Sequence, residues 1–321
     1  MKAICRTTYG SVEILELRET AKPSPKDNEL LLRVCAASVN PLDWHILRGE
    51  PFLVRLMGFG LLKPKHHILG ADMAGRVEAV GKNVTQFKVG DEVLGSGMGG
   101  FAEYACIRED RATLKPANLT HEQAAAVPVA GLTALQALRD KGRIQEGQHV
   151  LINGASGGVG TFAVQIAKAL GAQVTGVCSG KNVAMVRSIG ADHVIDYTEE
   201  DFWTRGTQYD LIIDNAAFYS IRKPLRALKA TGVYVAVGGS SSTAAVLRSL
   251  IVNPIVAKMK GRRVVSLMAN VNQADLVFMK ELLEAGKVVP VIDRKYHLNE
   301  TPEAIRYVEE GHARGKVIIS V

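Results

Sequence analysis

A run of glycines between a short apolar segment and a helical pattern constrains this chain more than any other feature. Residues 149–153 have the length and β-branched content of a buried parallel strand, and residues 161–170 repeat apolar side chains at helical spacing. The turn between them therefore joins the carboxyl end of a strand to the start of a helix. Unpaired N–H groups and a partial positive charge at such a start favour a pyrophosphate. We expect a dinucleotide to bind there, at Ser156, Gly157, Gly158, Val159 and Gly160.

The residues around this turn strengthen the interpretation. A second strand is predicted over 173–178, a helix over 181–189 and a third strand over 193–195, which completes a β-α-β-α-β pattern. Further strands are predicted over 211–214 and 233–237. Ala155 stands where the strict G-x-G-x-x-G pattern has its first glycine. The pattern predicts a Rossmann-type, doubly wound parallel sheet, and a tight turn with no ligand stays open as the alternative to a dinucleotide site.

The end of the second strand bears on which nicotinamide coenzyme binds. An Asp or Glu about 20 residues past the glycines would hold a ribose 2′-hydroxyl. This chain has Ser179 and Lys181 there instead, and a hydroxyl and an ammonium suit a 2′-phosphate. Tyr197 follows the third strand and is expected on the same side. We therefore expect NADPH rather than NADH, the alternative being that Ser179 is a turn residue and Lys181 a solvated helix start.

Composition limits the classes of protein that remain. The 321 residues are 47% hydrophobic and 22% charged, which indicates a folded chain of two ordinary domains. Its four cysteines are scattered, so neither a disulfide framework nor a zinc knuckle is expected. The first residues run into a plausible strand without a signal or transit pattern, and we expect a cytoplasmic protein.

The net charge of +7 raises the question of an anionic partner. Lys258, Lys260, Arg262 and Arg263 cluster, but without interleaved aromatic residues, so a solvated basic face is favoured and nucleic acid is not expected. The apolar segment 52–62 is too short to span a bilayer, and we expect it to be buried or to face substrate. No transmembrane segment is expected, and peripheral membrane contact is not favoured.

The chain on either side of the glycine turn differs in character. Before the turn, short β-rich stretches between Gly, Pro and Asp predict a β-barrel-like domain with strands over 29–36, 74–80, 92–94 and 102–107. Residues 122–139 predict helices interrupted at Pro128 and Gly131. The tail predicts alternating strands and helices over 264–269, 273–285, 288–292, 302–310 and 316–321. We expect residues 1–125 to begin the first domain, 126–263 to form the nucleotide-binding domain and 264–321 to complete the first.

Several longer motifs carry a resemblance to a known family. They are Ser38-Val39-Asn40-Pro41-Leu42-Asp43-Trp44-His45, Leu69 to Gly81, Phe87 to Val93, the glycine turn, and Gly311-His312-Ala313-Arg314-Gly315-Lys316-Val317. Together they resemble the medium-chain dehydrogenase/reductase superfamily, within it the zinc-independent quinone oxidoreductase branch. The resemblance implies a GroES-like β-barrel catalytic domain beside a Rossmann domain in a homodimer.

The resemblance also implies further cofactor contacts. It places Thr133 near the nicotinamide and His312, Ala313 and Arg314 on the cofactor. Backbone at Gly238 is expected against the cofactor as well, because a strand ends there in two glycines. An acceptor pocket is expected to involve Phe52, Leu56, Phe59 and Leu267, and Leu267 is also expected at the cofactor.

Departures from the zinc alcohol dehydrogenases indicate the chemistry. Asn40 replaces a ligand cysteine, Gly70-Ala71-Asp72 replaces the G-H-E motif, and the loop with four structural cysteines is missing. We therefore expect no metal, which makes alcohol oxidation hard and leaves hydride transfer from NADPH to a quinone or to the C=C bond of an α,β-unsaturated carbonyl.

Asn40 is the expected catalytic hydrogen-bond donor and is also an expected cofactor contact facing the nicotinamide, with Asp43 orienting it. The alternative is that both residues only cap a turn before a helix. Two other functions also stay open: an NADPH-binding protein with little turnover that binds nucleic acid or a partner, and a metal-free alcohol dehydrogenase.

Overall fold

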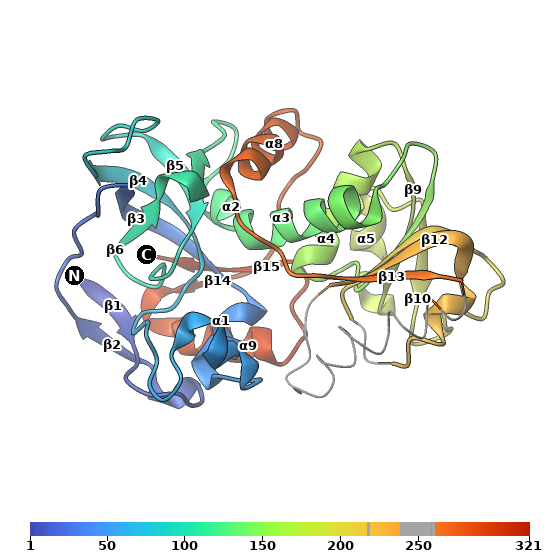
Figure 1. Cartoon of the computed structure of the whole chain (residues 1–321), viewed down its shortest axis with the longest axis horizontal. Helices are drawn as coiled ribbons and strands as arrows, with labels where there is room; N and C mark the ends of the chain where they lie inside the picture. Colours follow the sequence, from blue (N-terminus) through green and yellow to red (C-terminus); the bar gives the residue numbers. More distant parts are fainter. Residues whose placement is uncertain (217–218, 238–257, 259–260) are drawn as a thin grey trace. The chain divides into compact units, whose positions relative to one another are not determined.

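The computed structural model describes residues 1–216, 219–237, 258 and 261–321 (Figure 1). It divides into two units, the first made of residues 1–132, 271–285 and 290–321, the second of residues 133–270 and 286–289. The first unit therefore takes residues from both the early and the late part of the chain.

The second unit is built on a six-stranded parallel sheet in the order β10-β9-β8-β11-β12-β13. Its strands are β8 (His149–Asn153), β9 (Gln173–Cys178), β10 (His193–Asp196), β11 (Tyr209–Asp214), β12 (Leu228–Val237) and β13 (Arg263–Leu267). This is the Rossmann strand order, in which the order of successive strands across the sheet reverses between the first strand, β8, and the fourth, β11. The expected fold class of this half is confirmed, and sheets of this kind bind ligands at the carboxyl ends of the strands where the order reverses, here β8 and β11.

Helices α4 (Gly158–Ala169) and α5 (Val183–Ser188) connect the first three strands of this sheet (Figure 1). Phe162 and Ile166 on α4 are fully buried, as their helical spacing predicts. The helix begins three residues earlier than expected, because Gly157 serves as its N-terminal cap. The glycines thus belong partly to the turn and partly to the first helical turn.

Strand β13 corrects one expectation for the tail. The strand predicted over 264–269 was expected to complete the first domain, but β13 pairs in parallel with β12, Val264 opposite Tyr234. Its apolar residues suit a sheet strand in either domain, so sequence pattern alone does not choose the sheet.

The first unit contains a seven-stranded sheet in the order β14-β15-β3-β4-β5-β7, with β6 also paired to β3. These strands are β3 (Glu29–Val39), β4 (Asp72–Val80), β5 (Glu92–Ser96), β6 (Tyr104–Arg108), β7 (Ala112–Leu114), β14 (Ile292–His297) and β15 (Lys316–Ser320). A separate hairpin joins β1 (Lys2–Cys5) and β2 (Glu16–Glu19). The early half of β3 pairs with β6 and its late half with β15, so the sheet curves towards a barrel.

The helices that accompany this sheet are α1 (Pro41–Arg48), α2 (His121–Ala125), α3 (Pro128–Gln136, which runs into the second unit), α8 (Gln273–Glu284) and α9 (Thr301–Glu309). Pro128 starts α3, as a helix-initiating proline does, but Gly131 lies inside the helix and does not interrupt it. The strand expected over 288–292 is also wrong, since β14 begins only at Ile292. Because charged residues occupy consecutive positions of β14, the strand lacks the alternation of apolar and polar residues by which a strand is predicted.

Two apolar cores stabilise the first unit. One lies among β3, β4, β5 and β6 and includes Leu30, Leu32, Met73 and Val93; the other joins β3 and β15 to α1 and α9. All four cysteines are free thiols, as expected. Among the described residues, no helix combines the length and the apolar character needed to cross a membrane.

Candidate coenzyme site and buried polar network

The glycine turn after β8 forms a tight cradle. Gly154 adopts a left-handed conformation with φ 71°, and the N–H of Gly157 donates to its carbonyl at 3.1 Å. A Cβ on Gly160 would lie 2.0 Å from the Gly154 oxygen, so this position requires glycine. A Cβ on Gly157 would meet nothing nearer than 3.5 Å. Gly154 therefore makes the tight turn that the strict motif assigns to the position of Ala155.

The start of α4 supplies the donors expected for an anion. The helix has twelve residues, no acidic residue in its first turn and no side-chain cap at Gly157. The N–H groups of such a first turn have no partner within the helix and carry partial positive charge. The chain thus offers the cradle and the donors that fit a pyrophosphate.

Three side chains meet where β8 and β9 end. The amide of Asn182 donates to the hydroxyls of both Ser156 and Ser179, each at 3.1 Å. Lys181 is exposed beside them, and the side chain of Tyr197 is 60% exposed. The structure therefore joins two of the predicted cofactor residues, Ser156 and Ser179, through a residue that the sequence did not single out.

Asp196 at the end of β10 adds a carboxylate near this place. Its Oδ1 accepts from the N–H of Thr198 at 2.9 Å and from the Thr198 hydroxyl at 2.7 Å, and these bonds hold its pKa below the ordinary value. A Cβ on Gly180 would lie 2.4 Å from its Oδ2. The sequence argument for NADPH looked for an acid only at the end of β9 and missed this one, which comes from the neighbouring strand.

The other predicted cofactor residues are spread through the chain. Leu267 ends β13 and is half-buried, and Thr133 lies on α3. His312, Ala313 and Arg314 form the loop between α9 and β15 in the first unit, where the Arg314 N–H donates to Asp293 at 2.9 Å. Gly238 lies outside the described residues, as does Lys260 of the basic cluster.

A buried polar network surrounds Asn40 in the first unit. Its Nδ2 donates to Asp72 at 2.9 Å, and its Oδ1 accepts from the ammonium of Lys316 at 2.6 Å. Asp72 also accepts from the Ser38 hydroxyl, and its Oδ2 lies 3.5 Å from the Lys316 nitrogen. Asn40, Asp72 and Lys316 are at most 3% exposed. Strand register explains the meeting, because Ser38 pairs with Asp72 and Val39 pairs with Val317.

Asp43 holds the backbone next to this network. It is fully buried, and its carboxylate accepts from the N–H of Asn40 at 2.8 Å and from the N–H of Gly70 at 3.2 Å. The capping geometry raised as an alternative is therefore present at the start of α1. Within the described ranges, the second N–H of the Asn40 amide has the Ser38 carbonyl as its acceptor, at 3.5 Å, and is weakly held.

Burial dominates the electrostatics of the network. It raises the pKa of Asp43 to about 7 and raises that of Asp72, although the Lys316 ammonium opposes the shift of both. Burial lowers the pKa of Lys316 against the attraction of the two carboxylates. One buried ammonium thus offsets the charge of two buried acids, an arrangement that is stable only when the hydrogen bonds of all three are satisfied.

This donor set does not fit zinc. A catalytic zinc needs three ligands such as His, Cys or Glu, and an amide and a lysine ammonium are not such ligands. In the described ranges, no group of three or more His, Cys, Asp or Glu side chains could hold a metal ion. No step of the chemistry is therefore assigned to a metal.

Sequence reasoning missed Asp72 and Lys316 as network members and Asn182 as the residue that joins two serines. Lys316 carries a detectable signal, a single charge directly before the apolar run of β15. Asn182 carries none, since an asparagine at a helix start is common.

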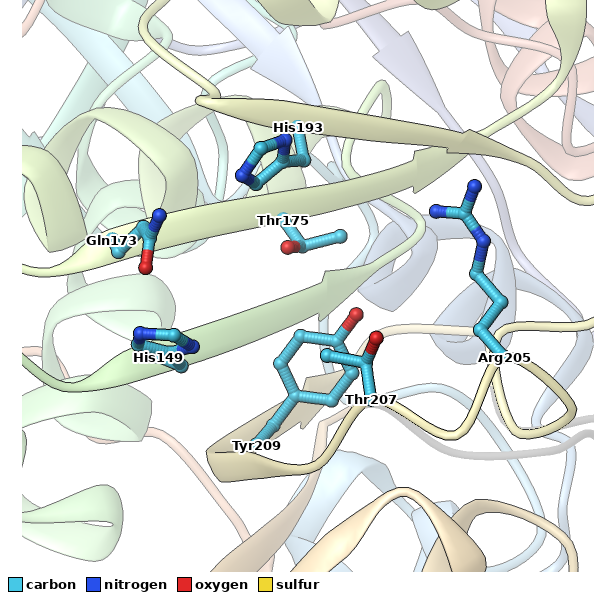
Figure 2. Close-up of a pocket in the computed structure, with 7 residues that line it drawn as sticks. All are labelled: His149, Gln173, Thr175, His193, Arg205, Thr207 and Tyr209. Atoms are coloured by element: carbon cyan, nitrogen blue, oxygen red, sulfur yellow. The ribbon is translucent and has the colours of Figure 1, made fainter.

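A cavity of about 220 Å³ lies at the amino-terminal ends of the strands of the parallel sheet (Figure 2). His149, Gln173, His193 and Tyr209, which line it, are the first residues of β8, β9, β10 and β11. It is therefore distinct from the glycine turn, which follows the carboxyl end of β8.

A barrel-like unit of GroES type together with this Rossmann sheet defines the medium-chain dehydrogenases and reductases. Residues 26–117 match the alcohol dehydrogenase GroES-like domain family and residues 189–319 the zinc-binding dehydrogenase family. The chain belongs to the medium-chain dehydrogenase/reductase superfamily and, by its relatives, to the quinone oxidoreductases within it.

Three relatives carry this assignment. The chain is 34% identical to the chloroplast envelope quinone oxidoreductase homolog of Arabidopsis thaliana, over 99% of this chain and 98% of that protein. It is 33% identical to the mitochondrial NAD(P)H oxidoreductase RTN4IP1 of Bos taurus, over 98% and 87%. The solved quinone oxidoreductase from Coxiella burnetii superimposes with a TM-score of 0.88 at 34% identity, covering 100% and 99% of the two chains. The chain is thus an oxidoreductase that uses a nicotinamide coenzyme.

Proposed function

We propose that this chain is an NADPH-dependent, zinc-independent reductase of quinones or of the C=C bond of α,β-unsaturated carbonyl compounds. The observation that carries the proposal is the set of groups at the carboxyl ends of β8 and β9. There the glycine cradle stands beside Ser156, Ser179 and the exposed ammonium of Lys181. These groups match the pyrophosphate and the 2′-phosphate of that coenzyme.

When bound, the reduced nicotinamide supplies a hydride. Because a quinone or an enone is already electrophilic, the protein needs only to orient the acceptor and to stabilise the negative charge that grows on its oxygen. We propose the weakly held N–H of Asn40 as that donor and Asp43 as the residue that fixes the Asn40 backbone. Removal of the Asn40 side chain should therefore lower kcat by a larger factor than it raises the Kd for NADPH.

The experiment follows oxidation of NADPH and NADH by a panel of quinones and enones, on protein whose metal content has been measured. We expect turnover without zinc. Lys181→Ala should raise the KM for NADPH about tenfold and that for NADH much less, because a charged hydrogen bond is lost only with the 2′-phosphate. Lys229→Ala is the matched control, since Lys229 pairs with Asp210 at the opposite edge of the sheet.

Three results would contradict the proposal: a requirement for stoichiometric zinc, no turnover of any quinone or enone, or equal effects of Lys181→Ala on the two coenzymes. A KM for NADH well below that for NADPH would assign the Asp196 carboxylate, rather than Lys181, the deciding role. A homodimer is part of the same proposal, and light scattering after size exclusion tests it.

A further inference from the structure

Asn182 occupies an unusual place at the carboxyl edge of the Rossmann sheet. It lies between the end of β9 and the start of α5 and is only 6% exposed. Its Nδ2 is shared between the hydroxyl oxygens of Ser156, in the turn after β8, and Ser179, after β9. One amide group thus links the two turns that end neighbouring strands.

The orientation of this amide follows from its partners. As placed, its nitrogen donates to two acceptors, and its Oδ1 is buried without a partner among the residues that the structure describes. The reversed orientation would bury both N–H groups without those acceptors, and a hydroxyl rotates freely to give or accept a proton. Because two unpaired donors cost more than one unpaired acceptor, the observed orientation is preferred.

The direction of these hydrogen bonds determines whether each serine hydroxyl can still donate one to a ligand. Both hydroxyls accept from Asn182, so each keeps its own proton to donate. Across the ranges that the structure describes, neither Ser156 nor Ser179 donates to an acceptor in the chain, and both are half-exposed. Lys181 is exposed two residues beyond Ser179. Two oriented O–H donors and a cation therefore stand ready for an anionic ligand.

We propose that Asn182 is a positioning residue that presets these hydroxyls as donors, Ser156 towards the pyrophosphate of the coenzyme and Ser179 towards its 2′-phosphate. The proposal rests on the proposed function and extends it, because it assigns part of the coenzyme preference to a residue that need not touch the coenzyme.

The test uses Asn182→Asp, which keeps the shape of the side chain but replaces the two donors with acceptors. Each serine proton is then drawn to the new carboxylate and away from the ligand. By fluorescence titration of the full chain, we expect the Kd for NADPH to rise about tenfold more than the Kd for NADH, which lacks the 2′-phosphate. Asn118→Asp is the matched control, because Asn118 also donates from Nδ2, to the Leu283 carbonyl. Both of these residues belong to the first unit, whereas Asn182 belongs to the second.

A double-mutant cycle separates positioning from a general loss of structure. In a Ser179→Ala background, Asn182→Asp should change the ratio of the two Kd values much less, only through the charge that it adds, whereas in a Ser156→Ala background the full change should remain. Effects that are equal for both coenzymes, or additive with Ser179→Ala, would overturn the inference.

If Asn182→Asp does not fold, as judged by its thermal unfolding, the Ser156→Ala/Ser179→Ala variant decides. It must show the same NADPH-selective loss, and wild-type affinity for NADPH in that variant overturns the inference. Failure of the proposed function is distinguishable, because it is measured as turnover of quinones and enones by the wild-type chain, whereas the Kd values of the variants test the inference.

Discussion

Replacing Lys316 with methionine should destabilise the first unit severely. Lys316 is 3% exposed, and its ammonium lies 2.6 Å from the Asn40 oxygen and 3.5 Å from Asp72, which is fully buried. Two unit charges at that separation attract by roughly 5 kcal/mol at an effective dielectric constant of about 20. Methionine retains most of the volume but leaves the Asp72 carboxylate buried without a cation. Loss of one partner of a buried pair costs about 3–5 kcal/mol, and we expect a loss in that range.

The cost should depend on pH. Without the ammonium, the pKa of Asp72 in the folded state rises further above its unfolded value. A carboxyl shifted in that direction loses stability as pH rises through its folded pKa. The destabilisation caused by Lys316→Met should therefore be smaller at pH 5 than at pH 8.

Urea unfolding followed by tryptophan fluorescence measures the effect. Trp44 packs in the apolar core of the first unit, whereas Trp203 belongs to the second, so a Trp203→Phe background isolates the signal. Lys82→Met is the control, because Lys82 and Asp27 form an exposed pair at 3.1 Å that is worth less than about 1 kcal/mol. Asp72→Asn added to Lys316→Met should recover much of the loss, since no uncompensated charge remains. Equal costs for the two lysine variants, or no recovery in the double variant, would refute the reasoning.

Three further predictions concern the glycine turn and the buried carboxyls. Gly157→Ala should leave the free energy of unfolding unchanged, because its Cβ meets nothing nearer than 3.5 Å. The same methyl group should weaken NADPH binding at least about tenfold, because it occupies the cradle. Gly160→Ala should instead lower the free energy of unfolding by about 1–3 kcal/mol or more, measured by urea unfolding. The folded pKa of Asp43, about 7, lies above the ordinary 3.8, so this carboxyl should lower stability as pH rises through that window, and Asp43→Asn should flatten the slope by up to about 1.4 kcal/mol per pH unit. Tyr234→Phe removes a hydrogen bond to the buried Asp214 and should cost about 1.5–3 kcal/mol by the same assay, an effect below 0.5 kcal/mol being evidence against it.

Local patterns predicted the elements of the second unit well. A buried parallel strand is apolar along its whole length, and α4 repeats its apolar residues at helical spacing, so β8, α4 and β9 were found within a few residues. The partner of a strand is a different matter, because it depends on contacts far away in sequence. The tail strand β13 was expected in the first domain for this reason, although it pairs with β12.

The same distinction separates the predicted from the missed parts of the site. The glycine turn is contiguous, and its residues were identified from spacing alone. The network around Asn40 brings together residues from β3, β4 and β15, and only their register shows that Lys316 meets Asn40. Asp196 was missed similarly, since it approaches Gly180 from the neighbouring strand.

The place of β15 in the first unit has a consequence for the order in which the two units fold during synthesis. This strand lies between β14 and β3, although residues 316–320 leave the ribosome some 280 residues after β3 does. Until then, the late half of β3 lacks its neighbour and Asp72 lacks its counter-ion. The Rossmann unit, whose strands are close in sequence, is free to fold during synthesis. The first unit can therefore complete its sheet only after residues 316–320 have been made, and until then the late half of β3 is an open strand edge.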